Sequence, residues 1–161
     1  MVSAENFSQE IKFWGHPNVL STHRNTVEIT IDEEISKRAD CILGVRATHG
    51  CRELTPEIRN HILTGEPLQL EIKVQGLNYN FLGRGSKELE LTDPREMVFR
   101  KSNFSSPRTV AVSCNAASID IPREIVELLR DPAVFGSLTI MALKPIQFPE
   151  VQIPMIDFPV D

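Results

Sequence analysis

Two stretches of the chain concentrate cationic and imidazole side chains but contain no carboxylate. They run from residue 13 to 27 and from 97 to 118, and all 22 acidic residues lie outside them. Their basic and imidazole residues are His16, His23, Arg24, Arg100, Lys101 and Arg108. Local positive fields of this kind attract anions, even on a chain whose net charge is −5. Buried strands that simply exclude carboxylates are the alternative explanation.

The two histidines of the first stretch could act together only if the backbone bends between them. Seven residues separate His16 from His23, which would place them on opposite faces of one continuous strand. The sequence Gly-His-Pro-Asn at 15–18 is typical of a turn, and we expect it to bend the chain and bring the two imidazoles together. Histidine binds metals and titrates near neutral pH, although an isolated histidine more often has a structural hydrogen-bonding role, which we would expect here without the bend.

The candidate ligand-binding residues combine charge neutralisation with directional hydrogen bonding. Arg84 joins them because it lies between two glycines in a flexible stretch at 83–88. The full set is His16, Asn18, His23, Arg84, Arg100, Lys101 and Ser102. The leading hypothesis is a binding module for a small anionic or phosphorylated ligand. The alternatives are a metal-dependent or acid–base enzyme that uses His16 or His23, and a structural or assembly protein.

Other catalytic and metal-binding patterns are weak. Cys41, His49 and Cys51, with His23 as a further candidate ligand, could be combined into a zinc site, but their spacing lacks the tight ligand pairs of structural zinc. No Gly-x-Ser-x-Gly motif occurs, and no Cys or Ser stands beside a His in a known signature. The sequence therefore assigns no metal set, no cofactor and no catalytic residue.

Composition indicates one globular domain. The chain has 161 residues, of which 41% are hydrophobic and 24% charged. No apolar run approaches the roughly 20 residues that span a bilayer, and the first residues lack a signal-peptide pattern, so we expect a cytoplasmic protein without membrane contact. The pI of 5.4 argues against non-specific nucleic-acid binding.

Alternation of apolar and polar residues predicts a mainly β fold. The expected strands lie at 27–31, 41–47, 68–74, 79–84, 97–102, 109–114 and 137–143. A first helix should be capped by Thr55, begin at Pro56 and end at Gly65. A second should open at Pro122 with Asp120 or Ile121 as its cap. We predict an antiparallel β-sandwich, jelly-roll-like, with two short helices; an α+β domain with a single sheet is the alternative.

The chain divides into a domain at 1–143 and an extension at 144–161. The two halves of the domain echo one another, and one loose alignment superposes Pro17 on Pro94 and Arg24 on Lys101; chance and duplication both explain it. The extension carries Pro149, Pro154 and Pro159, which predict extended backbone. It either covers its own domain or docks on a second copy in a homo-oligomer.

Several short motifs together resemble one archaeal family. They are GHPNVLSTHRNTVEIT, DCILGV, GRG, MVFRKS and RTVAV, and their order and spacing agree from about Ile11 to Leu143. The family is the domain of unknown function numbered three-seven-one. The residues that fall in its motif blocks are His16, Asn18, His23, Thr26, Asp40, Arg84, Gly85, Arg100, Lys101 and Ser102. The resemblance implies a mainly β, sandwich-like domain in an archaeal cytoplasm, and it implies no activity.

Overall fold

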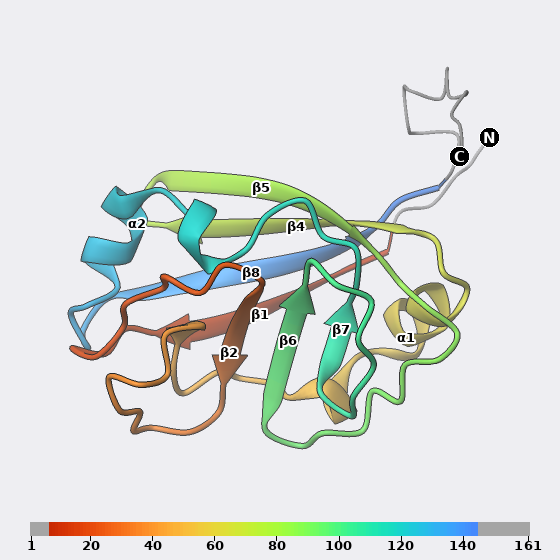
Figure 1. Ribbon diagram of the computed structural model, residues 1–161, viewed down its shortest axis with the longest axis horizontal. Helices are drawn as coiled ribbons and strands as arrows, with labels where there is room; N and C mark the ends of the chain where they lie inside the picture. The colour runs from red at the N-terminus through yellow and green to blue at the C-terminus, as the bar shows by residue number, and fades with distance from the viewer. Residues whose placement is uncertain (1–6, 145–161) are drawn as a thin grey trace.

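Two four-stranded sheets face each other in this computed structural model, which describes residues 7–144 (Figure 1). Sheet A has the strand order β1 (Ser8–Trp14), β8 (Phe135–Ala142), β4 (Pro67–Val74) and β5 (Leu77–Arg84). Sheet B has the order β3 (Ile42–Gly44), β2 (Thr26–Thr30), β6 (Glu96–Arg100) and β7 (Thr109–Ala111). The prediction of a mainly β sandwich with two short helices is confirmed. The proposed extension, apart from Lys144, lies outside the described residues, as does its predicted self-association.

The apolar faces of the two sheets meet in one core. Leu68, Leu70 and Ile72 of β4 are fully buried, whereas the residues between them are half-buried, as alternation predicts. Phe81 of sheet A and Phe99 of sheet B meet edge to face across the core, with ring centroids 6.5 Å apart. Such aromatic pairs add to the stability that burial alone gives.

Both predicted helices are present and lie at opposite ends of the molecule (Figure 1). Helix α1 (Pro56–Leu63) is capped as expected, because Thr55 Oγ1 accepts a hydrogen bond from the backbone of Ile58. Helix α2 (Arg123–Leu128) is capped by Pro122, so the predicted cap at Asp120 or Ile121 is wrong. The Asp120 carboxylate instead closes the preceding 3-10 turn η2 (Ser118–Asp120). Neither helix of the described segment is long and apolar enough to cross a membrane.

The second half of the fold repeats the first. β1, β2, β3, the 3-10 turn η1 (Cys51–Glu53), α1 and β4 are followed in the same order by β5, β6, β7, η2, α2 and β8. The end of β1 bridges to Val45 through Trp14, and the end of β5 bridges to Val112 through Arg84. This repetition of order and hydrogen bonding supports a duplication.

The structural repeat has a different register from the loose sequence alignment. Because Trp14 is equivalent to Arg84, Pro17 is equivalent to Lys87 and not to Pro94. The superposition of Arg24 on Lys101 fails for the same reason. That alignment pairs a segment at 16–26, which is mostly loop, with a segment at 93–103 that contains β6, whereas the backbone pairing of the sheets sets the true equivalence.

Strained backbone positions also recur in both halves. Ser21 and Leu91 are equivalent and both have positive φ, 50° and 56°, a region that non-glycine residues rarely adopt. Arg123 donates to the carbonyl of Ser21, and Arg59 donates to the carbonyl of Leu91. These two arginines therefore hold the turns in place and serve the fold.

A pseudo-twofold axis relates the two halves and passes through the centre of each sheet. The central pair of sheet B, β2 and β6, is antiparallel, and Glu28 lies directly opposite Val98. The outer pairs of sheet B, β2 with β3 and β6 with β7, are parallel. The Glu28–Val98 pair therefore marks where the axis crosses sheet B.

Candidate functional site

Polar side chains gather on the outer face of sheet B, around the pseudo-twofold axis. In β2, Val27 and Ile29 belong to the core, so Thr26, Glu28 and Thr30 point the other way. The segments that lead into β3 and β7 add further polar groups to this face. We call the following residues the axial cluster: Thr26, Glu28, Cys41, Glu96, Arg100, Ser106, Arg108 and Thr109.

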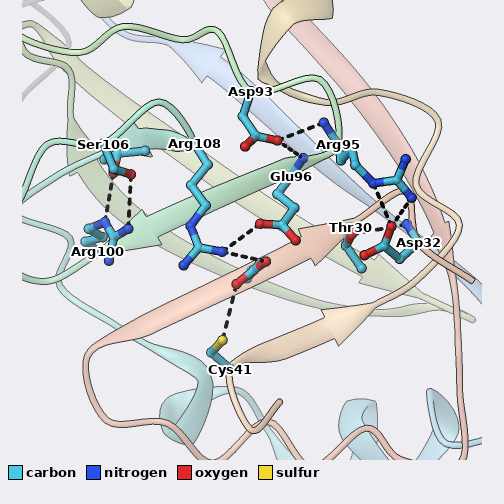
Figure 2. Close-up of polar contacts among 11 residues, drawn as sticks. Thr30, Asp32, Cys41, Asp93, Arg95, Glu96, Arg100, Ser106 and Arg108 are labelled. Atoms are coloured by element: carbon cyan, nitrogen blue, oxygen red, sulfur yellow. Dashed lines mark hydrogen bonds and ion pairs between the residues drawn. The ribbon is translucent and has the colours of Figure 1, made fainter. Parts of the chain in front are cut away.

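Glu28 is the buried carboxyl of the axial cluster and has two hydrogen-bond donors. Its side chain is 5% exposed. Oε1 accepts from the Cys41 thiol at 3.3 Å, and Oε2 accepts from Arg108 Nη1 at 3.5 Å. The same Arg108 nitrogen donates to Glu96 Oε1 at 2.6 Å (Figure 2). Arg108 is therefore shared by two carboxyl groups that lie on neighbouring strands.

The environment of Glu28 favours its neutral form. Burial raises the pKa of Glu28 to about 7, and the charge of the neighbouring Glu96 acts in the same direction. The charge of Arg108 and the hydrogen bond from Cys41 oppose this shift but do not cancel it. Glu28 is thus a carboxyl group that can gain or lose a proton near neutral pH.

Cys41 acts in this site as a hydrogen-bond donor. Burial, followed by the charge of Glu28, raises the pKa of the Cys41 thiol to about 12. A thiol with so high a pKa is a weak nucleophile and a poor metal ligand. Within residues 7–144 no three His, Cys, Asp or Glu side chains form a set that could hold a metal ion. The zinc alternative built on Cys41 has no geometric support in this part of the chain.

Arg100 is the cation of the axial cluster whose side-chain hydrogen bonds go to hydroxyl groups. Its Nε donates to Thr109 Oγ1 at 2.8 Å, and its Nη2 donates to Ser106 Oγ at 3.3 Å (Figure 2). Its guanidinium carbon lies 4.9 Å from the centroid of the Phe104 ring, which is largely exposed. Burial and the nearby positive charge of Arg108 lower the pKa of Arg100. No salt bridge neutralises Arg100 among the described residues.

The axial cluster breaks the symmetry of the duplicated scaffold. Glu28 occupies the position equivalent to Val98, and Cys41 occupies the position equivalent to Arg108. The Glu28 carboxyl group at the axis therefore accepts hydrogen bonds from Cys41 and Arg108, which occupy equivalent positions in the two halves. Because the scaffold accepts an apolar valine at the equivalent position, the fold itself does not require a buried carboxyl group there. Perturbed buried groups that the fold does not need are candidates for function.

Of the seven residues predicted from the sequence, Arg100 belongs to the axial cluster, and His23, Lys101 and Ser102 lie beside it. His23 Nδ1 is 3.2 Å from Thr26 Oγ1, and Thr26 lies directly opposite Arg100 in the β2–β6 pair. Lys101 and Ser102 follow Arg100 at the end of β6, and Lys101 Nζ is 3.5 Å from Asp120. The predicted proximity of His23 to the end of β6 therefore agrees with the structure.

His23 also has a local structural role. Its Nδ1 accepts hydrogen bonds from the backbone of Asn25 and Thr26, and at the equivalent position Asp93 accepts from the backbone of Arg95 and Glu96. Both residues therefore order the turn that leads into a central strand. Because Nδ1 accepts these bonds, the neutral ring carries its proton on Nε2.

His16 and Asn18 lie in a separate cleft of about 440 Å³. The predicted turn is present, since the backbone of Val19 donates to the carbonyl of His16. Both His16 ring nitrogens have partners: Nε2 bonds to Glu34 at 3.0 Å, and Nδ1 accepts from the backbone of Asn18. No hydrogen bond joins His16 to His23 in the described part of the chain, and His23 is not among the residues that line this cleft. The geometry does not support convergence of the two imidazoles.

Arg84 lies at another corner of the fold. It ends β5 and bridges to Val112, and the next residue, Ser113, donates its backbone N–H to the carbonyl of Ser102. Arg84 is therefore linked to Ser102 through its bridge to Val112 and the hydrogen bond of the adjacent Ser113. The structure brings Arg84 near the end of β6 but shows no hydrogen bond from its side chain to the axial cluster.

Sequence reasoning missed the central members of the site, Glu28 and Glu96. Alternation placed Glu28 on the polar face of a strand, which is where solvent-exposed glutamates normally occur. Nothing in the local sequence marks it as buried. Arg108 carried a weak signal, because it lies in a stretch that lacks carboxylates.

Comparison with known proteins agrees with the resemblance of the motifs. A family model described as "Domain of unknown function (DUF371)" matches residues 11–142, which include every strand of the sandwich except the start of β1. A protein of the archaeon Methanocaldococcus jannaschii, named only as uncharacterised, is 36% identical over 121 residues. That alignment covers 75% of this chain and 90% of the relative. Because the matched region spans both halves of the duplicated domain, the chain belongs to the DUF371 family.

Proposed function

We propose that the protein binds a small anionic or phosphorylated ligand at the Arg100 end of the axial cluster. The observation that carries this proposal is the environment of Arg100. Its guanidinium is positioned by two hydroxyl groups, lies near a second arginine and has no carboxylate in a salt bridge within residues 7–144. An anion would supply the missing negative charge.

The groups around Arg100 suit recognition of a phosphate or a similar anion. A guanidinium presents paired N–H donors that match phosphate oxygens, and a charge-assisted hydrogen bond contributes roughly 1.5–3 kcal/mol. The hydroxyls of Ser106 and Thr109 fix the orientation of the guanidinium. The exposed ring of Phe104 packs against it and offers an apolar surface beside the charge. Lys101, directly after the same strand, adds a further cation, which lies 3.5 Å from Asp120.

A phosphate titration followed by NMR tests the proposal. We expect saturable shifts of the backbone amides at 100–109 when phosphate is added to the ¹⁵N-labelled protein at constant ionic strength. Arg100→Gln should weaken binding by roughly tenfold or more, because it removes a charge-assisted contact. Its matched control is Arg46→Gln, since Arg46 also lies over an aromatic ring, 5.6 Å from the centroid of Trp14, but outside the axial cluster.

Two results would contradict the proposal. One is equal weakening by Arg100→Gln and Arg46→Gln, which would indicate a non-specific charge effect. The other is a set of shifts that never saturates or that lies away from 100–109. Either result would remove Arg100 from the binding site.

A further inference from the structure

We propose that a proton shared between Glu28 and Glu96 controls anion binding at Arg100 by removing one of the two negative charges that Arg108 neutralises. This inference rests on the proposed function and adds its regulation. When both carboxyl groups are ionised, Arg108 is held between them, 2.6 Å from Glu96 and 3.5 Å from Glu28. When Glu28 carries a proton, Arg108 keeps Glu96 as its single ionised partner, and the positive charge of Arg100 is no longer offset by a second carboxylate nearby.

The balance of charge in the axial cluster is the first support. Its ionisable side chains are two arginines, Arg100 and Arg108, and two carboxyl groups, Glu28 and Glu96, besides the neutral thiol of Cys41. These charges cancel when both carboxyl groups are ionised. One added proton makes the cluster net positive, which favours an anion.

The location of the proton follows from burial. The Glu28 side chain is 5% exposed, whereas that of Glu96 is 23% exposed and forms the shorter contact with Arg108. Desolvation penalises a charge more at the buried position, so the proton resides mainly on Glu28. The raised pKa of Glu28, about 7, places this equilibrium in the physiological range.

Groups from each neighbouring element face Glu28. Cys41 precedes β3, Arg108 precedes β7, and Glu96 and Arg100 belong to β6. The thiol of Cys41 stays protonated, because its pKa is about 12. The other titratable groups near this face are Asp40, whose charge acts on Cys41, the Lys101–Asp120 pair, and His23. His23 contacts Thr26 on β2. A protonated His23 would also favour an anion, so the experiment must separate it from Glu28.

The duplicated scaffold supplies variants that keep the backbone contacts. His23→Asn removes the imidazole and retains an acceptor for the turn, as Asp93 does at the equivalent position. Glu28→Gln mimics the protonated carboxyl group. Should Glu28→Gln fail to fold, Glu28→Val replaces it, because Val98 fills the equivalent position.

Sulfate is the probe, because it stays fully ionised over the pH range used and reports only the protonation of the protein. Its affinity is measured by NMR at about pH 5.5 and about pH 8.5, on either side of the Glu28 titration, at constant ionic strength. We expect wild-type protein to bind sulfate on the order of tenfold more tightly at the lower pH. His23→Asn should keep most of this ratio. Glu28→Gln or Glu28→Val should bind with an affinity that hardly depends on pH.

The carboxyl resonance of Glu28 gives an independent readout. By reciprocity, sulfate must raise the proton affinity of Glu28 by the same factor by which the proton raises sulfate affinity, so the pKa of Glu28 must rise by the logarithm of that factor. A Glu28 resonance that titrates identically with and without sulfate overturns the inference.

The remaining outcomes distinguish the two proposals. Sulfate binding that depends on Arg100 but not on pH overturns the proton control and leaves the proposed function standing. A pH dependence that disappears in His23→Asn and persists in Glu28→Gln also overturns it, because the proton is then on His23. Absence of saturable sulfate binding at both pH values overturns the proposed function and this inference with it.

Discussion

Replacing Glu28 with Gln should change how the stability of the protein depends on pH. Burial raises the pKa of Glu28 in the folded state to about 7, from 4.5 for an unperturbed carboxyl. The folded protein therefore holds this proton more tightly than the unfolded chain does. Gln cannot ionise, so Glu28→Gln lacks this linkage while it keeps a side chain of similar shape.

The sign and the size of the effect follow from the direction of the shift. A carboxyl whose pKa is raised by folding adds stability that is fully present below its unfolded value of 4.5 and is lost as the pH rises through about 7. The difference between the two values corresponds to at most about 3 kcal/mol. Relative to Glu28→Gln, wild-type protein should lose about 2–3 kcal/mol of its free energy of unfolding as the pH rises from about 4.5 to above 8.

Urea denaturation of both proteins at a series of pH values measures this difference directly. The free energies of unfolding are extrapolated to zero urea and subtracted, so that groups common to both proteins largely cancel. Glu28→Val should give the same dependence on pH, because it also removes the titrating group. The difference in free energy of unfolding between the two proteins could instead stay constant within about 0.5 kcal/mol over this range, or grow in favour of wild type at high pH. Either result would refute the conclusion that burial raises the pKa of Glu28.

Three further predictions concern single positions. Gly85→Ala should lower stability by roughly 3 kcal/mol or more in thermal or urea unfolding, because a Cβ there would overlap a backbone carbonyl of α1. Gly76→Asn should be tolerated, because residue 76 has positive φ, which Asn can adopt, and open space around it. Arg123→Gln should cost roughly 2–3 kcal/mol in the same assay, because its guanidinium donates to four backbone carbonyls; a loss below about 0.5 kcal/mol would contradict this. Alkylation of Cys41 by iodoacetamide in the folded protein should be on the order of 100-fold slower than in urea, because its thiol pKa is about 12, and equal rates would contradict this.

Much of the fold could be predicted from the sequence. Each of the seven predicted strands is present, because alternation of apolar and polar residues reflects a local requirement: one face of a strand must be buried. The α1 cap was predicted for a similar reason, since Thr55 acts within its own turn. Strand β1 was missed because Ile11 and Phe13 are its only fully buried residues, too few to define a pattern.

The site could be predicted only in part. Arg100, Lys101, Ser102 and His23 were expected to share a surface, and the pairing of β2 with β6 does bring them to one end of sheet B. The expected pairing of His16 with His23 has no support, because the turn at 15–18 directs His16 towards Glu34. A turn motif predicts a bend, but the contacts made beyond the bend depend on the rest of the fold.

The β class of this protein, most of its strand positions and the two basic stretches that lack carboxylates follow from the local sequence. Where the charges meet depends on the tertiary fold. In the folded protein, carboxylates from other segments contact the basic residues of the stretches that lack them. Arg108 contacts Glu28, which lies 80 residues away, and Lys101 contacts Asp120 of the turn η2. The physical reason is that local sequence sets which face of a strand is polar, whereas strand pairing and register set which polar groups become neighbours. The buried carboxyl at the axis depends on that register and has no local signature.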